Sequence, residues 1–169
     1  DDQLPGARDA EALAVDGGAG ELIVVTKGRA GVVELYTAGL ADPGPPDAPP
    51  DTLRRIGALR LPIGENTGQF VTAADLSPDG SRLAVRSYTT LFEFPWPGSA
   101  SFDTLAAPAH STLIGALEPQ GEGVAWTGSD EGLVLVSEAR GGRPPALSRI
   151  RCPGPSRTDR ETPPRPSPE

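Results

Sequence analysis

Short runs of alternating hydrophobic and polar residues, separated by turns rich in Gly, Pro and Asp, recur along most of the chain. The clearest unit covers residues 71–96, VTAADLSPDGSRLAVRSYTTLFEFPW. Its Asp79-Gly80 pair lies between two strand-like runs, where it is a strong hairpin signal, because glycine accepts the positive φ of a tight turn. A third strand-like run follows directly, so the unit predicts a meander of short antiparallel strands.

This strand–turn–strand unit occurs three times, at residues 11–27, 72–88 and 122–138. The copies begin 61 and 50 residues apart. A period of that size around such a core is typical of four-stranded β-propeller blades. The aligned columns are Val15, Leu76 and Trp126; Leu22, Leu83 and Leu133; and Thr26, Ser87 and Ser137.

The alignment predicts an all-β chain whose residues 1–150 form a partial β-propeller. Two blades are clear, at about 9–61 and 72–117, and part of a third covers 121–150, although the second copy shows no clear fourth strand. Residues 151–169 are rich in proline and lack large hydrophobic side chains, which predicts a disordered tail. The residues expected to be buried are Leu13, Val15, Leu76, Leu83, Val85, Val124, Trp126 and Leu133.

Two blades and part of a third are too few to close a propeller ring. Propellers typically close with 4–8 blades. The chain could be a segment of a longer propeller, could close by self-association, or could fold as an open stack of sheets. We favour the segment, because an open stack would expose strand edges and blade faces. The expected partners are therefore the remaining blades or a second copy.

Charge and composition narrow the function classes. A net charge of −8 and a pI of about 4.7 argue against a nucleic-acid-binding surface, which needs a basic stripe. No hydrophobic run approaches membrane-spanning length. Cys152 is the only cysteine, so neither an internal disulfide nor a Cys/His zinc cluster is expected. The sequence shows neither a signal peptide nor an initiator Met, which is consistent with a processed or partial product.

Three motifs together resemble a known family. DAEALAVD at 9–16, VTAADLSPDG with LAVRSY at 71–88, and EPQGEGVAW at 118–126 are similar to bacterial, often actinobacterial propeller proteins described as phytase-like or "esterase-like activity of phytase". The resemblance spans about residues 8–140. It implies a propeller fold and, because most members are exported, an extracellular or cell-envelope location.

Three carboxylates form a candidate metal site. Glu11 and Glu122 occupy the same repeat position, at the start of the innermost strand, and Asp9 shares a strand face with Glu11. Carboxylates at the mouth of a propeller channel could bind calcium through their oxygens. The alternative is that they face solvent or cap turns, and Thr72 in the middle copy interrupts the ring of acids.

Arg86 and Glu138 form a candidate ligand-binding pair. Arg86 occupies a column where the other copies have Val25 and Val136, so its charge must reach solvent or pair with a carboxylate such as Asp75 or Glu93. The other interpretation is contact with an anionic small molecule, because the guanidinium fork suits phosphate or carboxylate. Glu138 lies in the next column, which we expect near one surface.

Two functions compete. One is a phytase-like or esterase-like hydrolase that uses channel carboxylates, with calcium as a candidate cofactor. The other is a ligand-binding, partner-binding or scaffold propeller. His110 is the only histidine and no G-x-S-x-G motif is present. We favour the second function, because no nucleophile with a neighbouring base is visible and a fold does not fix a reaction.

Overall fold

The computed structural model describes residues 8–28, 31–40, 52–62, 70–102, 105–114, 118–128 and 132–151. These residues form three β-sheets and one 3-10 turn, Ser99–Ser101, without an α-helix. No helix in this part of the chain has the length and hydrophobicity needed to cross a membrane. The all-β prediction is confirmed.

Each sheet is built on an antiparallel meander whose strands follow chain order, and the first sheet adds one short strand, which pairs in parallel at its outer edge. The first sheet contains β1 (Ala10–Asp16), β2 (Glu21–Thr26), β3 (Val32–Gly39), β4 (Arg54–Arg60) and the short β8 (Leu105–Ala106). The second contains β5 (Val71–Leu76), β6 (Arg82–Ser87), β7 (Thr90–Pro95) and β9 (His110–Leu113). The third contains β10 (Gln120–Trp126), β11 (Gly132–Glu138) and β12 (Leu147–Arg151).

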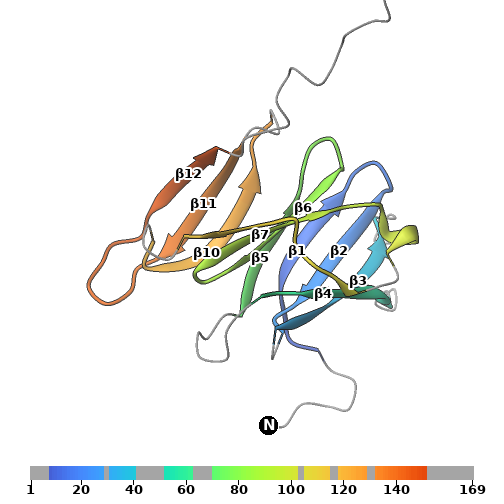
Figure 1. Cartoon of the computed structure of the whole chain (residues 1–169), viewed down its shortest axis with the longest axis horizontal. Coiled ribbons are helices and arrows are strands. Elements are labelled where there is room, and N and C mark those ends of the chain that lie inside the picture. The colour runs from blue at the N-terminus through green and yellow to red at the C-terminus, as the bar shows by residue number, and fades with distance from the viewer. Residues whose placement is uncertain are drawn as a thin grey trace, which may run out of the picture.

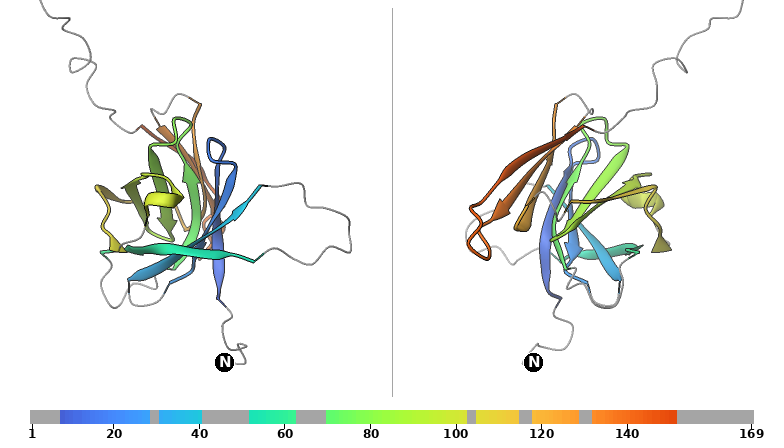
Figure 2. Two further views of the ribbon diagram at one scale, coloured as in Figure 1. Left: turned by 90° about the vertical axis from the view of Figure 1, so that its right-hand side faces the viewer. Right: turned by 60° about the vertical axis from the view of Figure 1, so that its left-hand side comes forward.

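The three sheets lie side by side in chain order. The opening strand of the second sheet, β5, contacts both β1 and β10, so it lies between the opening strands of the other two sheets. Figure 1 shows the second sheet between the other two, and Figure 2 shows the three sheets from two further sides. Up-and-down sheets joined at their opening strands have the arrangement of consecutive propeller blades, as the repeat predicted.

The repeat is visible in the hydrogen-bond register. The pairing of the first two strands shifts at the same place in every sheet, between Ala10 and Ala12, Val71 and Ala73, and Gly121 and Gly123. Such a shift is a β-bulge, in which one extra residue bends the strand. The partners just before the three bulges are the predicted column Thr26, Ser87 and Ser137.

Each sheet has a leading face, toward the preceding sheet, and a trailing face, toward the following sheet. The leading face of the second sheet and the trailing face of the first share one hydrophobic core. The leading face of the third sheet and the trailing face of the second share another. The first core includes Val25, Leu35, Leu76, Leu83, Val85, Phe92 and Phe94, and the second includes Ala84, Leu91, Ile114, Trp126, Leu133 and Leu135.

Two predicted core residues are not buried. Leu13 and Val15 are exposed, whereas Ala12, Ala14 and Asp16 of the same strand are buried. The prediction for Leu13 and Val15 was wrong because they lie on the leading face of the first sheet, where no described sheet precedes them. Of the other six predicted residues, Val124 is partly buried and packed against the second core, and the remaining five are buried: Leu76, Leu83, Val85, Trp126 and Leu133.

The second sheet has a fourth strand that the sequence did not make clear. β9 pairs with β7 at its outer edge. Before β9, the chain passes back to the first sheet, where β8 pairs in parallel with β4. Phe102 packs there against Gly57, which has no room for a Cβ, because one would lie 2.8 Å from the Phe102 ring.

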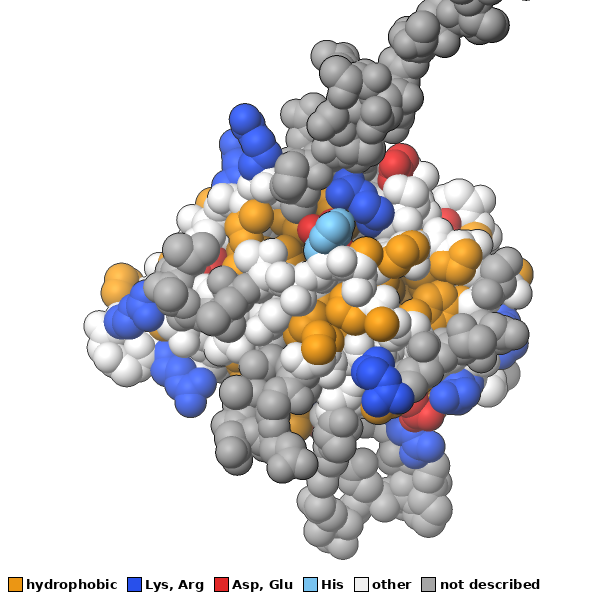
Figure 3. All heavy atoms as spheres, viewed as in Figure 1, with side chains coloured by type: hydrophobic (Ala, Val, Ile, Leu, Met, Phe, Trp, Pro, Cys, Tyr) orange, Lys and Arg blue, Asp and Glu red, His pale blue; other side chains and the backbone are white. Residues whose placement is uncertain are grey.

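The predicted tail at residues 151–169 lies outside the described residues apart from Arg151, which is the last residue of β12. In the space-filling view, hydrophobic side chains gather across the middle of the visible face and Lys and Arg side chains lie around them (Figure 3).

Candidate functional site

The three bulges place Glu11, Thr72 and Glu122 at equivalent positions of the opening strands. Bulges are common beside functional sites, because the extra residue aims its side chain away from the regular ladder. The predicted alignment of these positions is therefore reproduced in three dimensions, and the contacts of each side chain decide what the positions can do.

Asp9 and Glu11 surround a lysine. Lys27 Nζ lies 2.5 Å from Glu11 Oε1 and 3.9 Å from Asp9 Oδ2. The hydrogen bond to Glu11 is the main cause of a raised pKa at Lys27, so this ammonium is held in its charged form. The same ammonium lies 5.4 Å from the centre of the Phe70 ring. The two carboxylates thus share a cation that the chain itself provides.

Glu122 lies apart from this cluster, and its Oε1 accepts a hydrogen bond from Gln120 Nε2 at 2.7 Å. Within the described ranges, no three His, Cys, Asp or Glu side chains are grouped so that they could hold a metal ion. Calcium binding by Asp9, Glu11 and Glu122 stays a prediction.

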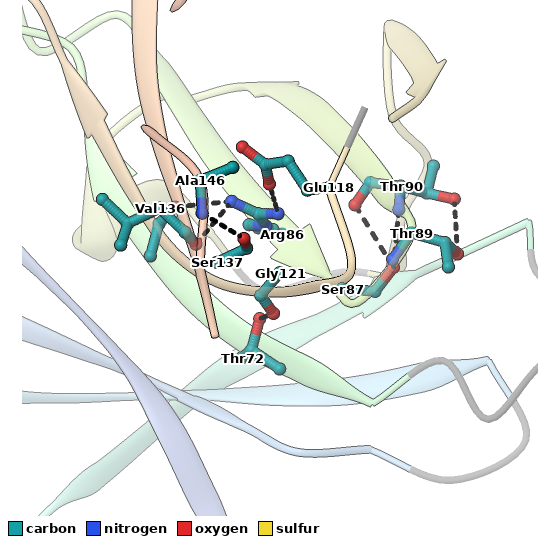
Figure 4. Close-up of polar contacts among 11 residues, drawn as sticks. Thr72, Arg86, Ser87, Thr89, Thr90, Glu118, Gly121, Val136, Ser137 and Ala146 are labelled. Atoms are coloured by element: carbon teal, nitrogen blue, oxygen red, sulfur yellow. Dashed lines mark hydrogen bonds and ion pairs between the residues drawn. The ribbon is translucent and has the colours of Figure 1, made fainter. Parts of the chain in front are cut away.

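Arg86 lies at the junction of the second and third sheets (Figure 4). Its side chain is fully buried and forms an ion pair with Glu118, which is also fully buried. Its Nη1 donates to the backbone carbonyls of Gly123 at 2.7 Å and Val136 at 3.1 Å. The predicted alternative of an ion pair is therefore realised, with Glu118 as the partner in place of Asp75 or Glu93.

The Arg86 contacts fix the bulge of the third sheet. A Cβ at Gly121 would lie 1.8 Å from Arg86 Nη2, so only glycine leaves room for the guanidinium there. The Gly121 carbonyl accepts a hydrogen bond from Thr72 Oγ1 at 2.9 Å. The bulges of the second and third sheets are in this way linked through buried polar groups, and among the described residues Arg86 Nε and Glu118 Oε1 have no hydrogen-bond partner.

Glu138, the other predicted ligand-binding residue, is exposed at the end of β11 and pairs across the strand with Gln120. The Arg86 ion pair is directed into the junction, toward Glu118, so the structure does not bring Arg86 and Glu138 together. Their roles as ligand contacts stay predictions.

Two further contacts hold the third sheet to the second. The backbone N–H of Trp126 donates to Asp75 Oδ2 at 2.7 Å. The Arg82 guanidinium lies 4.2 Å from the centre of the Trp126 ring, within the range of a cation–π interaction. The acidic and basic side chains of the second sheet's trailing face are therefore used for docking the next sheet.

The first and last described sheets carry exposed hydrophobic side chains, as expected for the end sheets of a propeller segment. Leu13 and Val15 lie exposed on the leading face of the first sheet, and Val136 and Leu147 lie exposed on the trailing face of the third.

The exposed leading face continues into a charged group, in which Glu34 accepts hydrogen bonds from Arg8, Arg55 and Tyr36. Burial would raise the pKa of the Glu34 carboxyl, but these hydrogen bonds outweigh burial and lower the pKa. The sequence carries a signal for both faces. In each aligned column of the repeat, the first and the last residue belong to sheets that have a described neighbour on one side only.

Comparison with known proteins gives a fold-level likeness. No family model matches the sequence, and no curated protein matches it. Among solved structures, KlAtg21 in its complex with the coiled-coil of AgAtg16 has a TM-score of 0.46 at 11% identity, over 85% of this chain and 42% of that one. The C-terminal WD40 domain of Sif2 has a TM-score of 0.47 at 14% identity, over 77% of this chain and 32% of that one. Hsv2 of Kluyvelomyces marxianus has a TM-score of 0.48 at 12% identity, over 84% of this chain and 46% of that one.

The chain spans less than half the length of each of these solved structures. All three are WD40 or β-propeller proteins, and none is a phytase-like protein.

Proposed function

We propose that this chain is a propeller-type scaffold module that binds a partner through the uncovered faces of its end sheets. The observation that carries the proposal is the contrast between Leu147 and its repeat equivalents. Leu147 pairs with Val136, as Leu35 pairs with Val25 and Leu91 with Arg86. Leu35 and Leu91 are buried under the following sheet, whereas Leu147 is 76% exposed.

Hydrophobic burial supports this function. An exposed leucine on a sheet face gains roughly 1.5–3 kcal/mol when a partner buries its side chain fully. Contiguous apolar surface with a polar rim is typical of protein-interaction sites. Both end faces carry such residues, and the Glu34 cluster supplies charged groups beside one of them.

No specific observation favours the hydrolase alternative. The buried Arg86 guanidinium binds Glu118, and Asp9 and Glu11 bind Lys27. Calcium binding and export to the cell envelope or the extracellular space stay predictions. Calorimetry of the chain with calcium tests the first, and fractionation of the producing cells tests the second.

Site-specific photo-cross-linking tests the scaffold function. A benzophenone amino acid replaces Val15 or Leu147 in the full chain inside the producing cell. Phe70 is the matched control position, because it is similarly hydrophobic and 37% exposed but precedes the middle sheet. We expect cross-links from 15 and 147, mapped by mass spectrometry to strands of alternating hydrophobic residues, and none from 70. Equal labelling at all three positions, or none at 15 and 147, would refute the proposal.

The same protein is assayed for hydrolysis of a phosphate monoester and a carboxylic ester. We expect no turnover above background. Turnover that disappears with Glu11→Gln or Glu122→Gln would replace the scaffold function with the hydrolase.

A further inference from the structure

We infer that the partner of each end face is a second copy of this chain, docked head to tail, with the leading face of one copy on the trailing face of the next. This inference rests on the proposed scaffold function and names its partner. It follows from comparing the end faces with the two sheet junctions that already exist in the molecule.

Both existing junctions join a trailing face to a leading face. At the first, Val25 and Leu35 of the trailing face share a core with Leu76 of the leading face. At the second, Leu91 of the trailing face shares a core with Trp126 of the leading face. The molecule therefore uses one docking rule twice.

The two end faces are the leading face of the first sheet and the trailing face of the third sheet, and no described sheet covers either of them. Val15 is the repeat equivalent of Leu76 and Trp126, since each pairs with its own sheet's member of one column: Leu22, Leu83 and Leu133, respectively. Val15 is 48% exposed, whereas Leu76 and Trp126 are buried. Its neighbour Leu13 is 54% exposed. The leading face of the first sheet thus presents the residue types that dock elsewhere in the chain.

The trailing face of the third sheet presents the complementary half. Val136 is 45% exposed, and its equivalents Val25 and Arg86 are fully buried. Leu147 beside it is the counterpart of the buried Leu35 and Leu91. We expect a leading face such as that of the first sheet to pack on this surface, because leading faces pack on trailing faces at the two internal junctions.

The chain's own remaining segments are poor candidates for these faces. Outside the described residues, the large hydrophobic side chains are Leu4, Ile63 and Leu117, which belong to three separate segments. Residues 152–169 contain none. Covering two sheet faces requires a patterned strand surface, and a second copy supplies that surface at both ends.

Docking of unlike faces has a definite consequence. A leading-on-trailing contact is heterologous, so every open assembly keeps one free leading face and one free trailing face, and it either closes into a ring or grows into a filament. A change on either face alone must therefore block the homogeneous assembly. The net charge of −8 also makes copies repel one another, so salt should strengthen the assembly by screening.

Sedimentation of the purified full chain over a range of concentrations tests the inference. We expect the unchanged chain to form oligomers and to associate more strongly in 0.5 M than in 0.15 M NaCl. Val15→Glu and Leu147→Glu should each weaken association by ~100-fold, because docking would then bury an unpaired carboxylate. Phe70→Glu is the matched control and should leave association unchanged. Circular dichroism should show the same fold in all variants, because the changed positions are exposed.

Mixing the two variants decides between head-to-tail docking and contact of like faces. Val15→Glu keeps an intact trailing face, and Leu147→Glu keeps an intact leading face. The mixture should form a one-to-one dimer and nothing larger. A mixture that stays monomeric, or a Val15→Glu chain that still associates alone, would overturn the inference. If the unchanged chain is monomeric but cross-links to another protein from positions 15 and 147, head-to-tail docking fails while the scaffold function stands.

Discussion

Trp96, which follows the second sheet's third strand, donates a hydrogen bond from Nε1 to Asp16 Oδ2 on the first sheet, at a distance of 3.0 Å. Both side chains are buried, and the Trp96 ring also stacks on Phe102. Asp16 accepts a second hydrogen bond, from the Ala19 backbone N–H, within its own hairpin turn. One carboxylate therefore shapes a turn and joins two sheets.

Asp16→Asn should lower the free energy of unfolding by roughly 1–3 kcal/mol, because Trp96 and Ala19 donate to different carboxylate oxygens and the NH2 group of Asn, itself a donor, can accept from neither. Urea unfolding monitored by tryptophan fluorescence measures the change. In a Trp96→Phe background the donor is gone, so the same substitution should cost less. Equal costs in both backgrounds would show that the Asp16–Trp96 hydrogen bond does not contribute.

The Arg86–Glu118 pair should behave as a coupled unit. Arg86→Met leaves the Glu118 carboxylate buried without its cation, which typically costs about 3–5 kcal/mol. The double variant Arg86→Met/Glu118→Leu removes both charges and should recover most of that loss. Arg55→Met is the control, because its ion pair with Glu34 is exposed and should be worth about 1 kcal/mol or less. Additive costs for the two changes would contradict the coupling.

Gly121→Ala should destabilise the chain strongly, whereas Gly123→Ala in the same strand should not. The added Cβ would lie 1.8 Å from Arg86 Nη2 at position 121 and 3.5 Å from the nearest atom at position 123. Because the guanidinium is buried and engaged with Glu118, it cannot swing into solvent. In an Arg86→Val background, which matches the side chains of the other two copies, the cost of Gly121→Ala should fall. Thermal melting of the four chains provides the comparison.

Acid stability should depend on Asp79 of the hairpin turn. Hydrogen bonds from Ser77, and then from the Ser81 side chain and backbone, lower the pKa of Asp79 to about 2. An unfolded chain has a pKa of about 3.9 at this residue. The folded form therefore gains stability from Asp79 above about pH 4, and loses it as the pH falls toward 2.

Asp79→Asn should accordingly lose less stability than the unchanged chain between about pH 4 and pH 2, with parallel curves above that window. Urea unfolding at a series of pH values gives both curves. Glu138→Gln, on an exposed side chain, is the control for removing one negative charge. Identical pH dependence in all three chains would contradict the role of the turn.

Local periodicity predicted most of the architecture, because each strand–turn–strand unit carries its own alternation and turn signals. The columns around Thr26, Ser87 and Ser137 fell at equal ladder positions, and the glycine of the Asp79-Gly80 turn has a φ of 69°. Periodicity does not reveal which face of a sheet has a neighbour. Leu13 and Val15 were therefore expected in the core, although their sheet is the first of the described series.

The sequence also did not predict which residues pair when they are far apart along the chain. Arg86 was expected to find a carboxylate within its own sheet, because Asp75 and Glu93 are the local acids. Those acids are used otherwise, Asp75 by the Trp126 backbone and Glu93 by Arg82. Glu118, which is 32 residues away in sequence, approaches Arg86 only once the third sheet has docked. A single chain without aligned relatives carries no signal for that choice.

The parallel pairing of β8 with β4 gives the chain an order of assembly during synthesis. The first four strands leave the ribosome in sequence and can pair at once, but the strand that covers their outer edge is made only after β5, β6 and β7. Throughout that interval the backbone groups of β4 are open to pairing with another nascent chain. Slower translation between β4 and β8 would lengthen this exposure, so the yield of native protein should depend on codon speed in this interval more than in the codons for β10 to β12.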